Sequence, residues 1–206
     1  AEHRTPIIAF VWRPEEIIPP VIHMAHRTGC RAIFDVSTLG VEALRPVLRQ
    51  ADPAGQVRDI KISASTLMDP ALGPWLQETG FQDIWVECHP QSFPSDPSAV
   101  LERLRELSEN HRCFPIIGDL PFLAAVVQDN RNIGRIVLKG CEASGFVSAE
   151  TTLALYAAVK EMRQTASNPL DIMIWGGVAT PEAAAAFLAT GAAGIVFESV
   201  HWLTDL

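Results

Sequence analysis

A lysine and a carboxylate follow directly after an apolar run in the stretch RIVLKGCEASGFVSAETT, residues 135–152. Lys139 ends the run, and Glu142 lies three residues later. A lysine can stabilise negative charge or act as a nucleophile, and Gly140 between them lets a ligand approach the backbone. The alternative is a surface turn with a Lys139–Glu142 salt bridge worth less than about 1 kcal/mol. We predict a binding-site rim, with Lys139 and Glu142 as catalytic candidates and Lys139 and Gly140 as cofactor contacts.

A second signal is the stretch WGGVATPEAAAAF, in which a strand-like run ends in two glycines just before a helix. The exposed amides of Gly176, Gly177 and Val178, next to a helix N-terminus, form a natural anion cradle. A tight turn that needs positive φ would also explain the glycine pair. Because the helix has a threonine N-cap at Thr180, with proline after it, we favour a phosphate site.

Eight apolar, β-branched runs alternate with helix-like segments along the chain, as in parallel strands covered on both faces. The runs are 6–12, 31–37, 59–65, 83–89, 113–119, 135–140, 171–177 and 193–199. The clearest helical segments are 41–50, 70–80, 96–111, 149–164 and 180–191. The count predicts an α/β protein with a compact (β/α)8 TIM barrel. A doubly wound sheet is the alternative, but it usually carries a glycine-rich turn after the first strand, which is missing here.

In a barrel, the active site lies at the carboxyl ends of the strands. The polar and aromatic residues expected there are Trp12, Arg13, Asp35, Ser37, Ser63, Ser65, Glu87, His89, Asp119, Lys139, Glu142, Glu198 and Ser199. Buried charges are costly unless they are paired, so charges on six strand ends favour a site. His89 is a third catalytic candidate. Glu87 and His89 share one face of a strand, but without a third ligand we predict no metal site.

Three motifs together resemble the nitronate monooxygenases, formerly called 2-nitropropane dioxygenases. They are TPIIAFVW, VLKGCEASGFVS and IWGGVATPEAAAAFLATGAAGIVFES. These enzymes, with the related flavin enoyl reductases, are FMN-dependent barrels. The resemblance in strand order runs from end to end, and the local match covers the first strand and residues 135–206. The most similar branch lies near the start of polyketide or polyunsaturated-lipid synthases. We therefore expect residues 1–206 to be a single barrel domain excised from a larger multidomain protein.

The resemblance implies a flavin along the sixth strand, whose motif matches at Lys139, Gly140, Glu142 and Gly145. It also implies a phosphate held by Gly176, Gly177 and Val178 and by the turn after the eighth strand, at Ser199.

The sequence departs from the family pattern at Ser144, which replaces the first of two paired glycines, at Phe146, and at Glu198 and Ser199, which replace a Gly-Thr pair. Phe146 stands where the family has its catalytic histidine, so nitronate oxidation by the usual base is not expected. Glu198 precedes Ser199 where the family has a glycine, and an inward carboxylate there would repel a phosphate.

Three functions follow from these residues. The first is an FMN-binding oxidoreductase-type barrel that acts on an acyl or nitronate-like small molecule, within a polyketide or fatty-acid-type synthase. The second is a degenerate, non-catalytic barrel that serves as a docking or dimerisation module in a multienzyme. The third, ranked last, is a cofactor-free lyase or aldolase with Lys139 as a Schiff-base amine, which would need a lowered lysine pKa.

Composition and charge argue against some classes of binding partner. The 206 residues carry a net charge of −8, and no Lys/Arg cluster occurs, so neither a nucleic acid nor a membrane surface is expected. No apolar run approaches the ~20 residues of a membrane span. Four cysteines without a C-x-x-C pair suggest a reducing, cytoplasmic location. The expected partners are a small-molecule or carrier-bound acyl substrate, other domains of a multienzyme, and a second copy of the chain in a homodimer.

Overall fold

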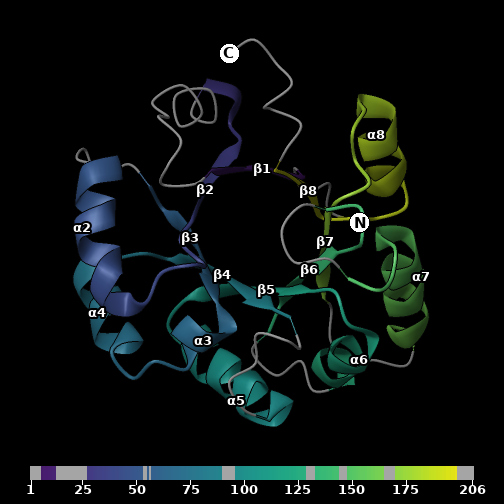
Figure 1. Cartoon of the computed structure of the whole chain (residues 1–206). Helices are drawn as coiled ribbons and strands as arrows, with labels where there is room; N and C mark the ends of the chain where they lie inside the picture. Colours follow the sequence, from purple (N-terminus) through teal and green to yellow (C-terminus); the bar gives the residue numbers. More distant parts are fainter. Residues whose placement is uncertain are drawn as a thin grey trace.

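The computed structural model of the protein describes residues 6–12, 27–52, 55, 57–89, 96–128, 133–143, 148–164 and 170–198. Eight parallel strands form a closed barrel in the order of the sequence, with β1 paired to both β2 and β8 (Figure 1). The strands are β1 (Ile7–Trp12), β2 (Arg31–Asp35), β3 (Asp59–Ser63), β4 (Asp83–Cys88), β5 (Arg112–Ile117), β6 (Arg135–Lys139), β7 (Asp171–Trp175) and β8 (Gly194–Phe197). The predicted (β/α)8 barrel is confirmed, and closure through β1 and β8 excludes the doubly wound sheet.

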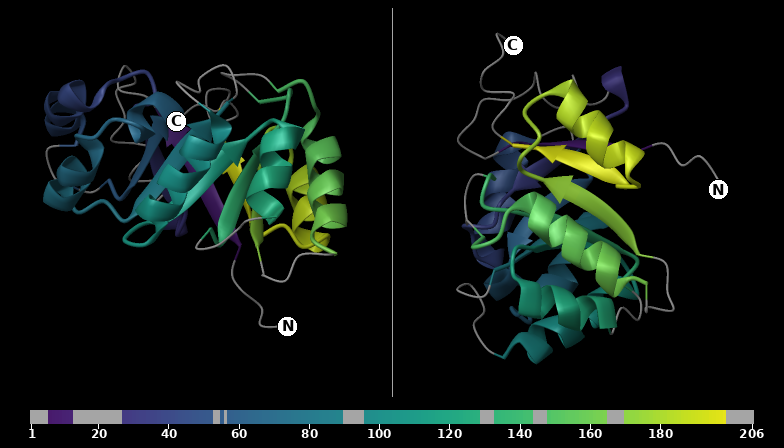
Figure 2. Two further views of the ribbon diagram at one scale, coloured as in Figure 1. Left: turned by 90° about the horizontal axis from the view of Figure 1, so that it is seen from below. Right: turned by 90° about the vertical axis from the view of Figure 1, so that its right-hand side faces the viewer.

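Helices lie outside the strands, and from α2 to α8 they follow the barrel wall (Figures 1 and 2). They are α2 (Val41–Ala51), α3 (Ala64–Leu67), α4 (Leu72–Thr79), α5 (Pro97–Ser108), α6 (Leu120–Gln128), α7 (Thr152–Met162) and α8 (Pro181–Ala189). The predicted cap of α8 is confirmed, since the Thr180 side chain accepts a hydrogen bond from the Ala183 amide. Residues 120–128, which form α6, were not singled out as a helix from the sequence, because the segment LPFLAAVVQ is apolar at most positions.

Alternate residues of each strand point to opposite faces, and the two faces form two separate cores. The outward core packs strands against helices, with Ile60 and Ile62 of β3 and Ile172 and Ile174 of β7 among its fully buried members. The inward core is smaller. It contains Ala9, Val11, Ile33, Trp85, Phe114, Ile116, Val137, Met173, Trp175 and Val196. The charged residues of the barrel interior share this inward alternation.

Charged residues begin six of the strands and close the amino-terminal end of the barrel. They are Arg31, Asp59, Asp83, Arg112, Arg135 and Asp171. Arg31 forms ion pairs with both Asp59 (Nη2–Oδ1 2.8 Å) and Asp83, and Arg112 also pairs with Asp83. The guanidinium groups of Arg31 and Arg135 lie over the Phe114 ring, 5.4 and 5.6 Å from its centroid. These contacts link the strands at the end opposite the expected active site, where Arg31, Asp59, Asp83 and Arg112 line a cavity of about 650 Å³.

Among these charged residues, Asp59 has a carboxyl whose charge its contacts compensate only in part. The indole Nε1 of Trp85 donates to its Oδ1 at 2.9 Å, and Arg31 pairs with it. Burial nevertheless outweighs both contacts and raises the pKa of Asp59 from 3.8 to about 6. Ionising Asp59 therefore opposes folding.

Among the described residues, no helix combines the length and the apolar character that crossing a membrane requires.

The raised pKa of Asp59 predicts a pH-dependent stability. Because the folded pKa exceeds the unfolded value, Asp59 stabilises the fold below about pH 4, and this contribution is lost as the pH rises through about 6, by about 3 kcal/mol. Asp59→Asn keeps an acceptor for Trp85 but cannot ionise. We expect wild type to lose about 3 kcal/mol relative to this variant between pH 4 and 7.5, measured by urea unfolding. Parallel stability curves for the two proteins would show that Asp59 ionises freely.

Candidate functional site

Glu87 joins two buried lysines at the carboxyl end of the barrel. Its Oε1 accepts from Lys139 Nζ at 2.6 Å, and its Oε2 pairs with Lys61 Nζ at 2.8 Å. The three residues come from β6, β4 and β3, and each is exposed by only 3 or 4%. The lysine of the sequence motif therefore points into the barrel and forms its ion pair with Glu87 rather than with Glu142.

Asp35 of β2 extends the same chain of charges. Lys61 Nζ donates to Asp35 Oδ2 at 2.9 Å, and Ser37 Oγ donates to Asp35 Oδ1 at 2.6 Å. Burial by itself would raise the pKa of both carboxyls, but the lysines outweigh it and hold the pKa of Asp35 and of Glu87 below the ordinary value. Burial would likewise lower the pKa of Lys61, yet Asp35 and Glu87 raise it. The order Asp35–Lys61–Glu87–Lys139 thus alternates in sign and sums to zero charge.

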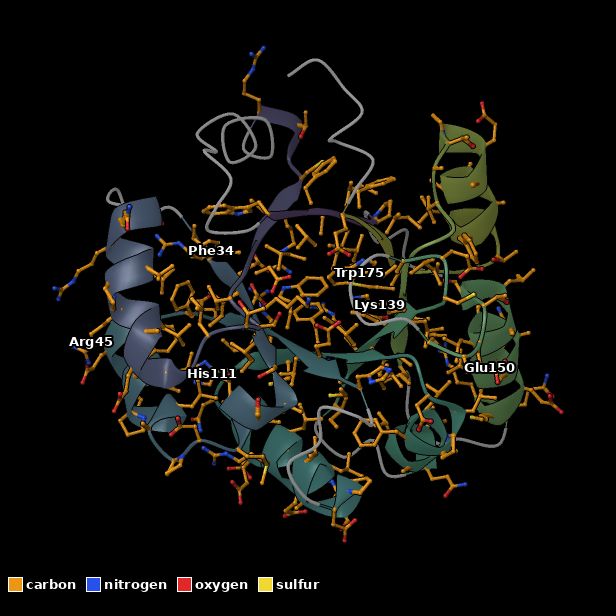
Figure 3. All side chains as sticks on the ribbon, in the orientation of Figure 1. Phe34, Arg45, His111, Lys139, Glu150 and Trp175 are labelled. Atoms are coloured by element: carbon orange, nitrogen blue, oxygen red, sulfur yellow. The ribbon has the colours of Figure 1, made fainter. Side chains whose placement is uncertain are left out.

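Trp175, the last residue of β7, lies over both lysines. The centre of its ring is 4.9 Å from Lys139 Nζ and 5.4 Å from Lys61 Nζ, and Figure 3 shows Lys139 and Trp175 side by side within the barrel. Its indole Nε1 donates to Glu198 Oε2 at 3.0 Å. The indole therefore lies between the charged interior and the carboxylate that follows β8.

A cavity of about 290 Å³ lies on the other side of this tryptophan. Its lining comes from the ends of β7 and β8 and from the turns after β6, β7 and β8. The lining residues are Glu142, Ala143, Trp175, Gly176, Gly177, Val178, Ala179, Val196, Phe197 and Glu198. The turns after three neighbouring strands therefore meet at one site, which neither Lys139 nor Gly140 lines.

Gly176 and Gly177 form a tight turn at the edge of this cavity, which we call the glycine corner. Gly176 has φ of 101° and Gly177 of 68°, values that residues with a side chain rarely adopt. A Cβ on Gly176 would also lie 2.9 Å from the backbone nitrogen of Ala143. Among the described residues, the amides of Gly177, Val178 and Ala179 find no hydrogen-bond acceptor. Those three amides are available to an anion or a carbonyl at the start of α8.

Glu142 is fixed beside this corner by Thr152. Its Oε2 accepts from the Thr152 amide at 2.9 Å and from Thr152 Oγ1 at 3.0 Å. Partial burial by itself would raise the pKa of Glu142, but these hydrogen bonds outweigh burial and hold the pKa below its ordinary value. A Cβ on Gly140 would overlap Thr152 and Glu142, so packing within this loop accounts for that glycine. A cofactor contact by Gly140 stays a prediction.

The remaining site predictions fall into two groups. His89 follows β4 and does not line the cavity at the glycine corner. Gly145, Phe146 and Ser199 lie outside the described residues, so their roles stay predictions. Within the described part of the chain, no group of three or more potential ligands could hold a metal ion.

Sequence reasoning missed Lys61 as a member of the site. The available signal was its place in DIKIS, where a lysine separates two isoleucines in the middle of a strand. Such a lysine must face the barrel interior if both isoleucines face the helices. The register sets Lys61 opposite Asp35, whereas Glu87 lies opposite Ser63, two residues after Lys61.

The buried ion pairs also argue against Schiff-base chemistry. A nucleophilic lysine must lose its proton, whereas Lys139 lies 2.6 Å from the Glu87 carboxylate and Lys61 has a raised pKa. The lyase reading is therefore the least compatible with this geometry.

No protein-family model matches the chain, and no curated protein matches it either. Many solved structures share its fold. FabK from Thermotoga maritima superposes with a TM-score of 0.71 at 17% identity, covering 96% of this chain and 59% of that one. The enoyl reductase domain of MlnA, from the macrolactin biosynthesis cluster of Bacillus amyloliquefaciens, gives 0.61 at 13% identity, covering 97% and 54%. N-acetylmannosamine-6-phosphate 2-epimerase from Clostridium perfringens gives 0.61 at 10%, covering 94% and 86%.

At these identities, the likeness establishes a shared barrel fold. The chain spans about 60% of the length of FabK and slightly more than half of the MlnA domain.

The charge chain predicts a large effect of removing its central member. Glu87→Gln takes away the charge that neutralises both Lys61 and Lys139, so we expect a loss of about 3–5 kcal/mol in the free energy of unfolding. Glu78 pairs with Arg45 on the surface, where both side chains are more than half exposed. Glu78→Gln should therefore cost less than about 1 kcal/mol. Urea unfolding of both variants gives the comparison, and equal small losses would mean that the buried pairs contribute nothing.

Proposed function

We propose that the chain is an FMN-binding barrel of the oxidoreductase type, which acts on an acyl or nitronate-like small molecule within a polyketide or fatty-acid-type synthase. The observation that carries the proposal is the corner after β7. There, three amides that find no acceptor among the described residues belong to the lining of a cavity that Trp175 also lines. Phosphate groups bind at such helix N-termini, and barrels commonly bind phosphate on the loops after strands seven and eight.

The described residues fit a flavin phosphate through their backbone. The amides of Gly177, Val178 and Ala179 would hold the phosphate oxygens, and the positive φ of Gly177 keeps a side chain out of the corner. Glu142 and Glu198 on the same cavity wall lower the affinity for that charge. A bound flavin would supply hydride transfer to the site.

The rest of the site would be made by the chain's own side chains. The Trp175 indole would pack against the ring system of the ligand. Lys61 and Lys139 contact the Trp175 ring from the barrel interior. Because Lys139 is neutralised by Glu87, we assign it the role of positioning Trp175 and not that of a free cation. Substrate binding would use the apolar part of the cavity, at Val196 and Phe197.

The synthase context is supported by the sequence motifs and by the fold shared with the MlnA enoyl reductase domain. One observation favours a non-catalytic docking module as the second candidate. The cavity wall carries two carboxylates and, among the described residues, no cation. A domain of that kind would bind no flavin.

The glycine corner gives the test. Gly177→Ala places a side chain on a residue with φ of 68°, next to the Glu142 carboxylate. We expect flavin affinity, measured by quenching of flavin fluorescence during titration with FMN, to fall about tenfold as the amides shift.

Gly80→Ala is the matched control, since Gly80 has φ of 70° at the C-terminus of α4, away from the cavity. Both variants should lose about 1 kcal/mol of stability, but only Gly177→Ala should weaken flavin binding. If wild type leaves FMN fluorescence unchanged, the flavin proposal fails and the docking module is favoured.

A further inference from the structure

The cavity of about 650 Å³ at the amino-terminal end of the barrel lies away from the proposed flavin site. We call it the amino-end cavity. Its lining comes from the first residues of β2, β3, β4 and β5 and from the segments just before β2, β3 and β4. It shares no described lining residue with the cavity at the glycine corner. A ligand of the amino-end cavity is therefore independent of the flavin.

The lining of the amino-end cavity is positively charged, although the whole chain carries a net charge of −8. Its described charged residues are three arginines and two aspartates, Arg31, Arg58, Arg112, Asp59 and Asp83. Arg31 pairs with both aspartates. The ion pairs thus leave one positive charge in excess, and a cleft with an excess of one sign attracts ligands of the other.

Two of the arginines have donors to offer to a ligand. Arg58 is exposed, and its guanidinium finds neither an ion pair nor an acceptor within the described part of the chain. Arg112 uses its Nη2 to pair with Asp83 at 2.6 Å, and its Nε and Nη1 find no acceptor among the described residues. A guanidinium presents its donors as a planar fork, which matches the oxygens of a phosphate or a carboxylate.

Asp83 gives an independent indication that the amino-end cavity is not arranged for stability alone. Its side chain is 2% exposed, and its Oδ2 accepts from both Arg31 and Arg112. Its Oδ1 is buried without a hydrogen-bond partner. An acceptor left unpaired in the interior is destabilising, and such groups commonly mark a bound water, a bound ion or a functional site.

We propose that the amino-end cavity binds a small anionic molecule, through a phosphate or carboxylate group that Arg58 and Arg112 hold. The proposal does not rest on the flavin-binding function. Arg31 compensates Asp59 and Asp83, which reduces their repulsion of the anion. The volume lies in the range of small-molecule sites, so the cavity has room for an organic molecule that carries the anionic group.

Titration with sulfate and with acetate, followed by the NMR shifts of backbone amides, tests the proposal. Sulfate has the shape of a phosphate group and acetate is a carboxylate, so the probe that binds more tightly identifies the group. Gly80 and Gln82 report on the amino-end cavity, whereas Gly177 and Val178 report on the glycine corner. We expect wild type to show saturable shifts at Gly80 and Gln82 with at least one probe.

Two substitutions in the lining should change this affinity in opposite directions. Arg58→Gln removes a charged donor that has no partner among the described residues, so it should weaken binding about tenfold without unfolding the protein. Asp59→Asn keeps an acceptor for Trp85 and removes a negative charge from the lining. At pH 7.5 it should tighten binding about fivefold.

Arg49→Gln is the matched control, because it removes an exposed arginine from the last turn of α2, outside the cavity. Its affinity should equal that of wild type. The proposal is wrong if neither probe shifts Gly80 and Gln82 in wild type, or if Arg58→Gln binds as tightly as Arg49→Gln. A protein that binds no flavin but shows these shifts and their loss in Arg58→Gln would lose the proposed function and keep this site.

Discussion

The Glu87 carboxylate between Lys61 and Lys139 is the interaction on which the mouth of the barrel depends. Two ammonium groups buried in a barrel need counter-charges, and Glu87 serves both of them, with Asp35 completing the set. The lysines in turn support the ring of Trp175, which orients Glu198. The position of the cavity wall is therefore linked to a pair of contacts deeper in the barrel.

Buried charges are compensated differently at the two ends of the barrel. At the amino-terminal end, arginines stack on Phe114 and pair with Asp59 and Asp83, but Asp59 remains poorly compensated and has a raised pKa. At the carboxyl end, the charges of the buried ion pairs alternate in sign, and the pKa values of Asp35 and Glu87 are lowered. The poorly compensated charge of Asp59 lies at the amino-terminal end, which in barrels serves stability. The well-compensated charges lie at the carboxyl end, where barrel enzymes have their active sites.

Much of the fold could be predicted from the sequence, because parallel strands covered on both faces leave long apolar runs. All eight strands were found, and the cap of α8 at Thr180 was found from its residue types. The helix α6 was not, since a mostly apolar segment does not separate helix from strand.

Side-chain partners could not be predicted, because they depend on strand register and on the distance across the barrel. Lys139 pairs with Glu87, 52 positions earlier in the chain, and not with Glu142, three positions later. Glu142 instead closes its own loop through Thr152. The positive φ at Gly176 and Gly177, which the sequence offered as the alternative to a phosphate site, is confirmed, because backbone conformation next to a helix start is a local property.

The two lysines at the mouth of the barrel pair with carboxylates of the protein itself. Neither lysine lines the cavity, whose described lining includes the glycine corner, Glu142 and Glu198. The proposed flavin site depends on these features.

The visible absorption spectrum of the purified protein after dialysis against FMN tests the proposed flavin site most directly. Our account predicts the bands of an oxidised flavin, in an amount comparable to the protein and released on denaturation. A protein that stays colourless after this treatment would contradict the flavin site and leave only the barrel scaffold.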